Sequence, residues 1–534
     1  MLQKKRGESS FQDCTKDGGE PFTDESMLLC YCSAHGCVIG TTMELSEHRY
    51  LNTLNQPCIL ALFTKQKPQI AKAAQKGILC NLFIVLIRNK PYLQTVNISI
   101  LFHPGKKINM KDINTVKVNF KGGIIPPARL YNILVAAGKS GLLNVRFGLR
   151  QQLLLDVSIE RLNEFTGELE KLGVSFELGN QECPNIVSSY PAEEIFIKDT
   201  WLTENIYKRV FQSFDYKPQL KINISDSNQS FTPMLTGNIN WVASPEEMNY
   251  WHLFIRFPKT NVVYNWKDII NTNDISAISS RIEEIIMAEH DIFYENDQAN
   301  GDELYEKVMT QTFDAKPAEK PVELPLFNLP YYEGLNHYTD DKYWLGIYRR
   351  DELFSIRFLK EACLLCIRTG TQQLCSTPWK TIIIKSIRDE NRNDWNDLLD
   401  KHQINLRHAA NELNFQVEDN SYKALQLKQY LVKYLNDDDT RTFGVSIGIK
   451  TKRKSEVFCS ILVRRRPLIR IGKLELFYLY DILCAKDYNP NERTDFIYSK
   501  DNPKLVLAEQ LRGAVLSYYS RNSKPVEQPV TESW

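Results

Sequence analysis

Two arginines, Arg146 and Arg150, stand in the otherwise apolar segment LNVRFGLRQQLLLDV, residues 143–157. Guanidinium groups keep their charge under all ordinary conditions and form paired hydrogen bonds to carboxylates. Residues four apart in a strand share a face and lie about 13 Å from each other. If the segment is one strand, both side chains project together and suit a polyanionic ligand. The alternative is a surface face, or pairing with glutamates such as Glu168 and Glu170.

Cysteine and histidine side chains offer two further clusters. The segment CYCSAHGC provides four soft metal ligands in eight residues: Cys30, Cys32, His35 and Cys37. Their spacing matches no common zinc pattern, so we predict no metal site and leave their role open. Cys363 and Cys366 lie in the helical pattern FLKEACLLCIR, where residues three apart share a face among leucines. They are predicted to be buried thiols.

The composition excludes several classes of protein. The net charge is +1 over 534 residues, so no bulk field attracts the chain to nucleic acid or to an anionic membrane. The longest apolar run, residues 77–87, is too short to span a bilayer and is typical of a buried strand. The N-terminal stretch is polar and lacks the apolar core of a signal peptide. We therefore expect a cytoplasmic protein with no nucleic-acid and no membrane partner.

The elements around the two arginines alternate between strands and helices. A strand ends at Gly122, a helix opens at Pro126, and the arginine-bearing strand follows. A second helix over residues 158–173 and a strand over residues 174–178 complete the unit. This order predicts an α+β layer structure resembling the ferredoxin-like motif.

The same order of elements recurs about 230 residues later. When the two segments are aligned, Trp379 corresponds to Arg150 and Cys375 corresponds to Arg146. We predict two pseudo-repeated half domains with mixed α/β segments and a cleft between the halves. The expected boundaries are residues 1–45 (irregular), 46–108 (small α/β segment), 109–182 (first half domain), 183–318 (first α/β domain), 319–330 (Pro-rich linker), 331–410 (second half domain), 411–520 (second α/β domain) and 521–534 (disordered tail).

Residues 117–155 resemble the half domain of the siroheme-dependent sulfite and nitrite reductases. In that family a strand ending in Gly-Gly precedes a helix and a strand with an R-L-T-x-R-Q motif. Here the motif reads RFGLRQ, which keeps Arg146, Arg150 and Gln151 and has Gly148 in place of threonine. The similarity extends over residues 110–480. PNIVSSYPAEEI resembles the family's Asn-Val segment, and KPQLKINISD resembles its lysine-bearing strand.

The resemblance implies which residues surround the siroheme carboxylates and the bound anion. Arg150 takes the arginine of the Arg-Gln pair, and Lys117 takes the basic position before Gly-Gly. Lys221 takes the second lysine of the K-F-K triplet, whereas the first has become Gln219. With Arg146 and Gln151, these residues form the expected cofactor-binding set, and the ligand is an anionic small molecule, siroheme or a related tetrapyrrole.

The iron–sulfur cluster of the family is not expected. Its four cysteines belong to regions that read FQVEDNSYKALQ and SIGIKTKRKSEV here, and neither contains a cysteine. Since each iron needs a thiolate, these side chains cannot replace the ligands. The sequence thus predicts a nitrite/sulfite reductase-like protein with a basic cleft and without the cluster.

Two alternatives stay open. The first is an active oxidoreductase fed by a separate electron donor, such as a rubredoxin-like protein. The second is a non-catalytic binding or scaffold protein, in which the basic run at Arg464, Arg465 and Arg466 serves a partner. Whether the chain is catalytic is not decided by the sequence.

Overall fold

The computed structural model describes residues 113–179, 183–339, 341–452, 457–471, 474–492 and 494–522. The chain divides into two compact units, residues 1–107 and 108–534, and all described residues belong to the second unit. The predictions for residues 1–45 and 46–108, for the Cys30–Cys37 cluster and for the tail beyond residue 522 therefore lie outside the described residues. Among the described helices, none combines the length and the apolar character needed to cross a bilayer.

The first half domain is an antiparallel sheet covered by two helices. Its neighbour order is β5–β1–β4–β3, the order of a split βαβ unit. The helices turn Leu130, Leu134 and Phe165 into the core, and the first helix begins at Pro127, directly after the expected Pro126. The elements are β1 (Ile113–Val118), α3 (Pro127–Lys139), β3 (Asn144–Phe147), β4 (Leu153–Ser158), α4 (Ile159–Lys171) and β5 (Glu177–Leu178).

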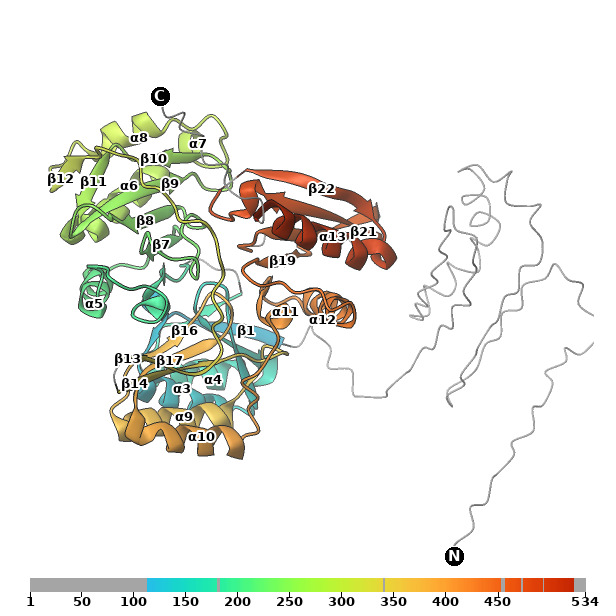
Figure 1. The fold of residues 1–534 in the computed structure, drawn as a ribbon. Coiled ribbons are helices and arrows are strands. Elements are labelled where there is room, and N and C mark those ends of the chain that lie inside the picture. Colours follow the sequence, from blue (N-terminus) through green and yellow to red (C-terminus); the bar gives the residue numbers. More distant parts are fainter. Residues whose placement is uncertain are drawn as a thin grey trace, which may run out of the picture. The chain divides into compact units, whose positions relative to one another are not determined.

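The second half domain has a second antiparallel sheet, in the order β13–β14–β17–β16. Its helix α9 packs on α3, so one hydrophobic core serves both half domains (Figure 1). Cys363 and Cys366 lie buried in this core, as their helical spacing predicted. The elements are β13 (Gly334–Thr339), β14 (Lys342–Ile347), α9 (Ile356–Thr369), β16 (Leu374–Ser376), β17 (Ile382–Arg388) and α10 (Arg392–Lys401).

Each half domain lends a two-residue strand to the other's sheet. Strand β2 (Ile124–Ile125) of the first half pairs with β16, with Ile125 opposite Leu374. Strand β15 (Phe354–Ser355) of the second half pairs with β3, where the rings of Phe354 and Phe147 meet edge to face at 5.1 Å. Because the exchange is reciprocal, the two sheets are held to each other by backbone hydrogen bonds.

A third sheet follows the first half domain. Strands β6, β7 and β8 are parallel, and β9 runs antiparallel to β8. All residues of β7 and β8 are buried, as is usual for parallel strands covered on both faces. The elements are β6 (Val187–Ser188), α5 (Glu204–Ser213), β7 (Ile222–Ser225), β8 (Ile239–Ala243), β9 (Tyr250–Arg256), β10 (Val263–Asn265), β11 (Asp268–Asn271), α6 (Ile275–Ala288), α7 (His290–Phe293), α8 (Gly301–Val308) and β12 (Ala315–Pro317).

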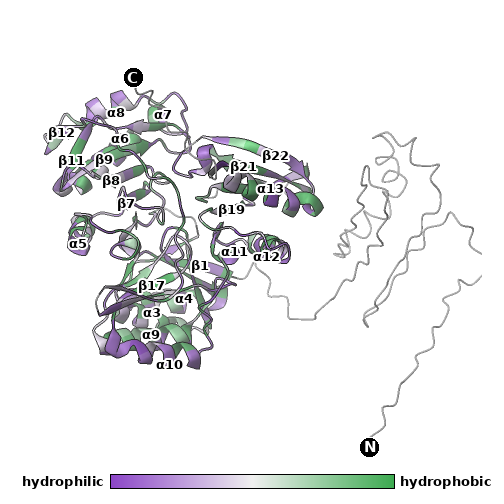
Figure 2. Cartoon of the chain, in the orientation of Figure 1, coloured by the Kyte–Doolittle hydropathy of each residue, from purple (hydrophilic) through white to green (hydrophobic). Residues whose placement is uncertain are grey.

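A fourth sheet follows the second half domain and also begins with three parallel strands, β18, β19 and β20. Antiparallel β21 and β22 complete it, and α12 and α13 contribute to its core. In Figure 2 the strands carry much of the hydrophobic colouring, whereas the outer helix α10 is largely hydrophilic. The elements are α11 (Ala410–Leu413), β18 (Phe415–Val417), α12 (Tyr422–Asp437), β19 (Ile447–Lys450), β20 (Ile461–Ile471), β21 (Leu474–Ala485), β22 (Asp495–Asn502) and α13 (Lys504–Asn522).

Candidate anion-binding site

The segment 143–157 is a hairpin, so its prediction as one strand is wrong. Strand β3 ends at Phe147 and β4 begins at Leu153. The turn between them is closed by hydrogen bonds from Gly148 N to Gln152 O and from Gln151 N to Gly148 O, both 2.9 Å. Arg146 therefore lies on a strand and Arg150 in a turn, and the two side chains do not share a strand face.

The charge of Arg146 is balanced within the hairpin. Its Nε donates to Oδ2 of Asp156 on β4 at 3.0 Å, and its Nη2 donates to Oδ1 at 2.7 Å. This is the two-pronged geometry in which a guanidinium binds a carboxylate most strongly. The partner is Asp156 and not Glu168, which pairs with Lys139 and Lys171.

Arg150 is buried, with 5% of its surface exposed, and points into the third sheet. Its Nη2 donates to the carbonyl oxygens of Asn185 at 2.7 Å and Ile222 at 3.0 Å, and its Nε donates to Asn185 O at 3.1 Å. Burial lowers the pKa of Arg150 below its ordinary value. A guanidinium nevertheless stays charged at neutral pH, so Arg150 brings a positive charge to the start of β7.

Gln151 and Lys117 make contacts within the protein. The Gln151 side chain pairs with the backbone of Ser188 through Nε2 to Ser188 O at 2.9 Å and Ser188 N to Oε1 at 2.8 Å. Lys117 Nζ donates to Gly179 O at 2.9 Å. Gln151 thus fastens the turn to β6, and Lys117 ties β1 to the residue after β5.

Lys221 lies within electrostatic range of two arginines, Arg150 and Arg256, and these three cationic residues are here called the basic cluster. Lys221 directly precedes β7, and its carbonyl oxygen accepts from Asn238 N and Ile239 N at the start of β8. Arg256 ends β9 and donates to Thr236 O at 2.7 Å. Burial and the charges of the two arginines lower the pKa of Lys221 to about 7.

Of the five predicted residues, the structure thus brings Lys221 into electrostatic range of Arg150. Gln151 adjoins Arg150 and shares its contact with Asn185, whereas Arg146 and Lys117 have their own partners in Asp156 and Gly179. Sequence reasoning missed Arg256. The available signal was an arginine in the apolar strand pattern WHLFIRF. Gln219, at the position of the family's first lysine, has its backbone N–H bound to Glu283 Oε2 at 2.7 Å.

Four of the described thiols lie in three separate hydrophobic cores. Cys363 and Cys366 lie in the core of the half domains, Cys375 in that of the third sheet and Cys484 in that of the fourth. Burial raises the pKa of each of these thiols. Over the described ranges, no three His, Cys, Asp or Glu side chains gather in a way that could hold a metal ion.

The basic run of strand β20 also makes internal contacts. Arg464 Nη2 and Arg466 Nη2 donate to the buried carboxylate of Asp481 on β21, at 3.0 and 2.8 Å. The guanidinium of Arg465 lies 4.2 Å from the ring centre of Tyr478. The run therefore joins two strands of the fourth sheet.

No model of a known protein family matches the sequence, and no curated protein matches it. Among solved structures, the NirA protein of Mycobacterium tuberculosis is similar, with a TM-score of 0.59 and 13% identity. The match covers 78% of this chain and 82% of that chain. At this identity the similarity shows the fold alone, a mixed α and β fold like that of NirA. The α+β class predicted from the sequence is confirmed.

Proposed function

We propose that this chain is a nitrite/sulfite reductase-like protein without the family's iron–sulfur cluster, and that its basic cluster binds a small inorganic oxyanion. The observation that carries the proposal is the convergence of Arg150, Lys221 and Arg256 from a turn and two strands. Like charges at close range in a partly buried place repel each other. An oxyanion would relieve that repulsion and restore the protonated form of Lys221.

The supporting chemistry is that of charge-assisted hydrogen bonds. Arg150 is fixed by three carbonyl contacts and Arg256 by its bond to Thr236 O, so both guanidinium groups are positioned before any ligand arrives. Lys221 supplies three rotatable donors on a flexible stem. The Nε and Nη2 groups of both arginines already bond to carbonyl oxygens, so under this proposal the arginines contribute fixed positive charge and Lys221 contributes the hydrogen bonds to a small anion such as sulfite, nitrite, sulfate or phosphate.

A tetrapyrrole fits these residues less well than a small anion does. A macrocycle with several carboxylates needs several cations around it. Of the predicted set, Arg146 is paired with Asp156, Gln151 with Ser188 and Lys117 with Gly179 O. We therefore derive no step through siroheme, and we treat its binding as an outcome to be tested.

We further propose that the two half domains are copies of one ancestral unit. The element orders β1–β2–α3–β3–β4–α4 and β14–β15–α9–β16–β17–α10 agree, and the exchange of β2 and β15 is reciprocal. The copies differ in one turn. Arg150 lies between β3 and β4 in the first copy, and its counterpart between β16 and β17 in the second copy is Trp379. Under this proposal only the first copy contributes a cation to the site.

Isothermal titration of the full chain with sodium sulfite, nitrite, sulfate and phosphate tests the proposal. We expect saturable binding of at least one anion, weakened at least tenfold in Lys221→Met and Arg256→Met, since a charge-assisted bond contributes about 1.5–3 kcal/mol. Lys217→Met is the matched control, because Lys217 is exposed four residues upstream. Equal binding in all variants, or no binding of any anion, would refute the proposal and favour the alternative of a non-catalytic scaffold protein.

The redox alternative has its own measurement. The chain is purified from cells that make siroheme, and its visible spectrum and its turnover of nitrite and sulfite with an artificial reductant are recorded. A Soret-like band with turnover would replace the small-anion proposal by a tetrapyrrole enzyme. A colourless protein that binds oxyanions is the expected result.

A further inference from the structure

The turn that carries Arg150 is tied to a loop of the fourth sheet. The backbone N–H of Leu149 donates to the carboxylate of Asp419, at 3.2 Å from each oxygen. Asp419 lies in the loop between β18 and α12, 270 residues further along the chain. A Cβ at Gly148 would lie 3.0 Å from Asp419 Oδ2, so the glycine permits this close approach. The residue before Arg150 is therefore held by a carboxylate from another part of the fold.

The same carboxylate pairs with a buried lysine of the second half domain. Asp419 Oδ1 lies 3.3 Å from Lys380 Nζ, which also donates to Glu352 Oε2 at 2.8 Å and to Glu418 O at 3.3 Å. Burial alone would lower the pKa of Lys380, but the carboxylates of Glu352 and Asp419 raise it, so the ammonium keeps its charge. The pair fixes both partners, because breaking it would leave an uncompensated buried charge.

Lys380 lies in a turn of the second half domain that repeats the turn of Arg150. Thr377 N donates to Thr381 O at 3.0 Å and Lys380 N donates to Thr377 O at 3.1 Å, the same pattern as in residues 148–152. Lys380 has a φ of 57°, and Gln151, at the corresponding position, has a φ of 59°. Asp419 thus contacts two equivalent turns at once, through the backbone of the first and the side chain of the second.

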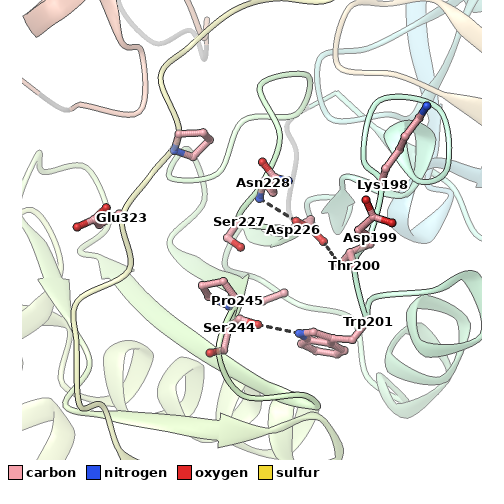
Figure 3. A pocket seen from close by; sticks show the side chains of 12 residues that line it. Lys198, Asp199, Thr200, Trp201, Asp226, Ser227, Asn228, Ser244, Pro245 and Glu323 are labelled. Atoms are coloured by element: carbon pink, nitrogen blue, oxygen red, sulfur yellow. Dashed lines mark hydrogen bonds between the residues drawn. The ribbon is translucent and has the colours of Figure 1, made fainter. Parts of the chain in front are cut away.

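Strand β7, whose Ile222 carbonyl accepts from Arg150, is held by contacts of its own. It pairs in parallel with β6 and with β8. At its far end, beside the cavity shown in Figure 3, Asp226 accepts from the hydroxyl of Thr200 at 2.6 Å and from the backbone N–H of Asn228 at 2.7 Å. Because the strand is anchored in this way, the position of Arg150 relative to it depends on the turn.

We propose that Asp419 is a positioning residue of the anion site, because its bond to the Leu149 N–H sets where Arg150 brings its charge to Lys221. This inference rests on the proposed function. It gives the fourth sheet and the second half domain a part in the affinity of a site to which they contribute no cation. A carboxylate near a cationic site opposes anion binding by its charge, and the ion pair with Lys380 offsets that charge.

Hydrogen–deuterium exchange of the full chain without ligand tests whether Asp419 holds the turn. We expect faster exchange of the peptide that contains Leu149 and Arg150 in Asp419→Ala. Asp419→Asn should exchange like the wild type, because its amide oxygen still accepts from Leu149 N. Asp397→Ala, which removes an exposed carboxylate from α10, is the matched control. Unchanged exchange in Asp419→Ala would overturn the proposal.

Calorimetric titration with sodium sulfite, nitrite, sulfate and phosphate tests whether the turn serves the site. We expect an affinity about tenfold lower in Asp419→Ala, the effect of losing one hydrogen bond to a charged group, with an unchanged number of anions bound per chain. Asp419→Asn and Asp397→Ala should bind like the wild type. Loss of charge alone would act in the opposite direction, because removal of a carboxylate favours anion binding.

Circular dichroism checks that each variant is folded, and the polar variant Asp419→Ser repeats both measurements if Asp419→Ala is not. Equal or higher affinity in the shortened variant, or fewer anions bound per chain at unchanged affinity, would overturn the positioning role. A wild type that binds none of the four anions would refute the proposed function and this role with it. The exchange measurement needs no anion, so it distinguishes that failure from a turn that Asp419 does not hold.

Discussion

Replacing Lys221 by methionine should stabilise the free protein, and the gain should depend on pH. Lys221 has a pKa of about 7 in the folded chain against 10.5 for an ordinary lysine. At low pH this pKa difference of about 3.5 lowers the free energy of unfolding of the wild type by roughly 5 kcal/mol, at about 1.36 kcal/mol for each pKa unit. Methionine has a similar length and carries no charge, so it removes that penalty without opening a cavity.

The sign of the pH dependence follows from proton uptake. Between pH 7 and 10.5 the lysine of the unfolded chain is protonated and that of the folded chain is neutral, so unfolding binds a proton and the wild type gains stability as pH rises. Between pH 6 and pH 9 this gain is about 3 kcal/mol, obtained from the same two pKa values. The advantage of Lys221→Met is therefore largest at pH 6 and has mostly disappeared at pH 10.

Denaturant unfolding at pH 6, 7.5 and 9 in a buffer without oxyanions measures this difference. Lys217→Met serves as the control, since Lys217 is exposed and should show no such trend. Addition of an oxyanion that binds should raise the stability of the wild type more than that of the variant, whose affinity for the anion is lower. A constant difference between wild type and Lys221→Met across pH, or one that grows with pH, would refute the reasoning about the basic cluster.

Three further substitutions probe the framework. Asp156→Asn should cost about 1 kcal/mol, seen in thermal unfolding, because it leaves Arg146 with a weaker acceptor. Gly123→Ala should lower the free energy of unfolding by more than about 2 kcal/mol, because φ is +77° and the new Cβ would lie 2.6 Å from a carbonyl oxygen. The control Gly167→Ala lies in a helix with open space around it and should be neutral or stabilising. Equal effects of the two substitutions would contradict the close packing inferred at Gly123. Asp481→Asn should lower the free energy of unfolding by about 3–5 kcal/mol, because the fully buried carboxylate bonds two arginines. Arg466 lowers the pKa of Asp481, in line with this pairing. An unchanged denaturation midpoint would show that the pairing does not stabilise the fold.

The helices could be predicted from the sequence because their signals are local. The first helix, which the sequence predicts to open at Pro126, spans Pro127–Lys139, between a proline that fixes its first turn and a glycine just beyond its end. The spacing of apolar residues that indicates a helix face is visible within the sequence of the segment itself. Such an element is recognised without knowledge of what it packs against.

The turn after β3 could not be predicted in this way. It contains no Asn-Gly or Asp-Gly pair, and apolar residues continue on both sides. Gln151 adopts a φ of 59° there, and its side chain is held by the backbone of Ser188, which lies 37 residues further along the chain. Because tertiary contacts stabilise the turn, periodicity alone favoured a continuous strand.

The exchanged strands escape prediction for a related reason. Ile124–Ile125 and Phe354–Ser355 are two residues long, so neither has a period that could be read. Their pairing partners come from the other half domain, more than 200 residues away in the sequence. The pairing becomes visible only when both sheets are in place, although the recurrence of the element order suggested that two such sheets exist.

The residues of the candidate site differ from those predicted for the same reason, because tertiary contacts that the local sequence pattern does not show decide which side chains lie near each other. A one-strand reading places Arg146 beside Arg150, but the hairpin gives Arg146 its own carboxylate across β4 and sends Arg150 to the third sheet. Lys221 then has two neighbouring charges, Arg150 and Arg256, and Arg256 belongs to none of the motifs that the sequence suggested. The proposal of an oxyanion follows from this membership, because three cations are fewer than a macrocycle with several carboxylates would need around it.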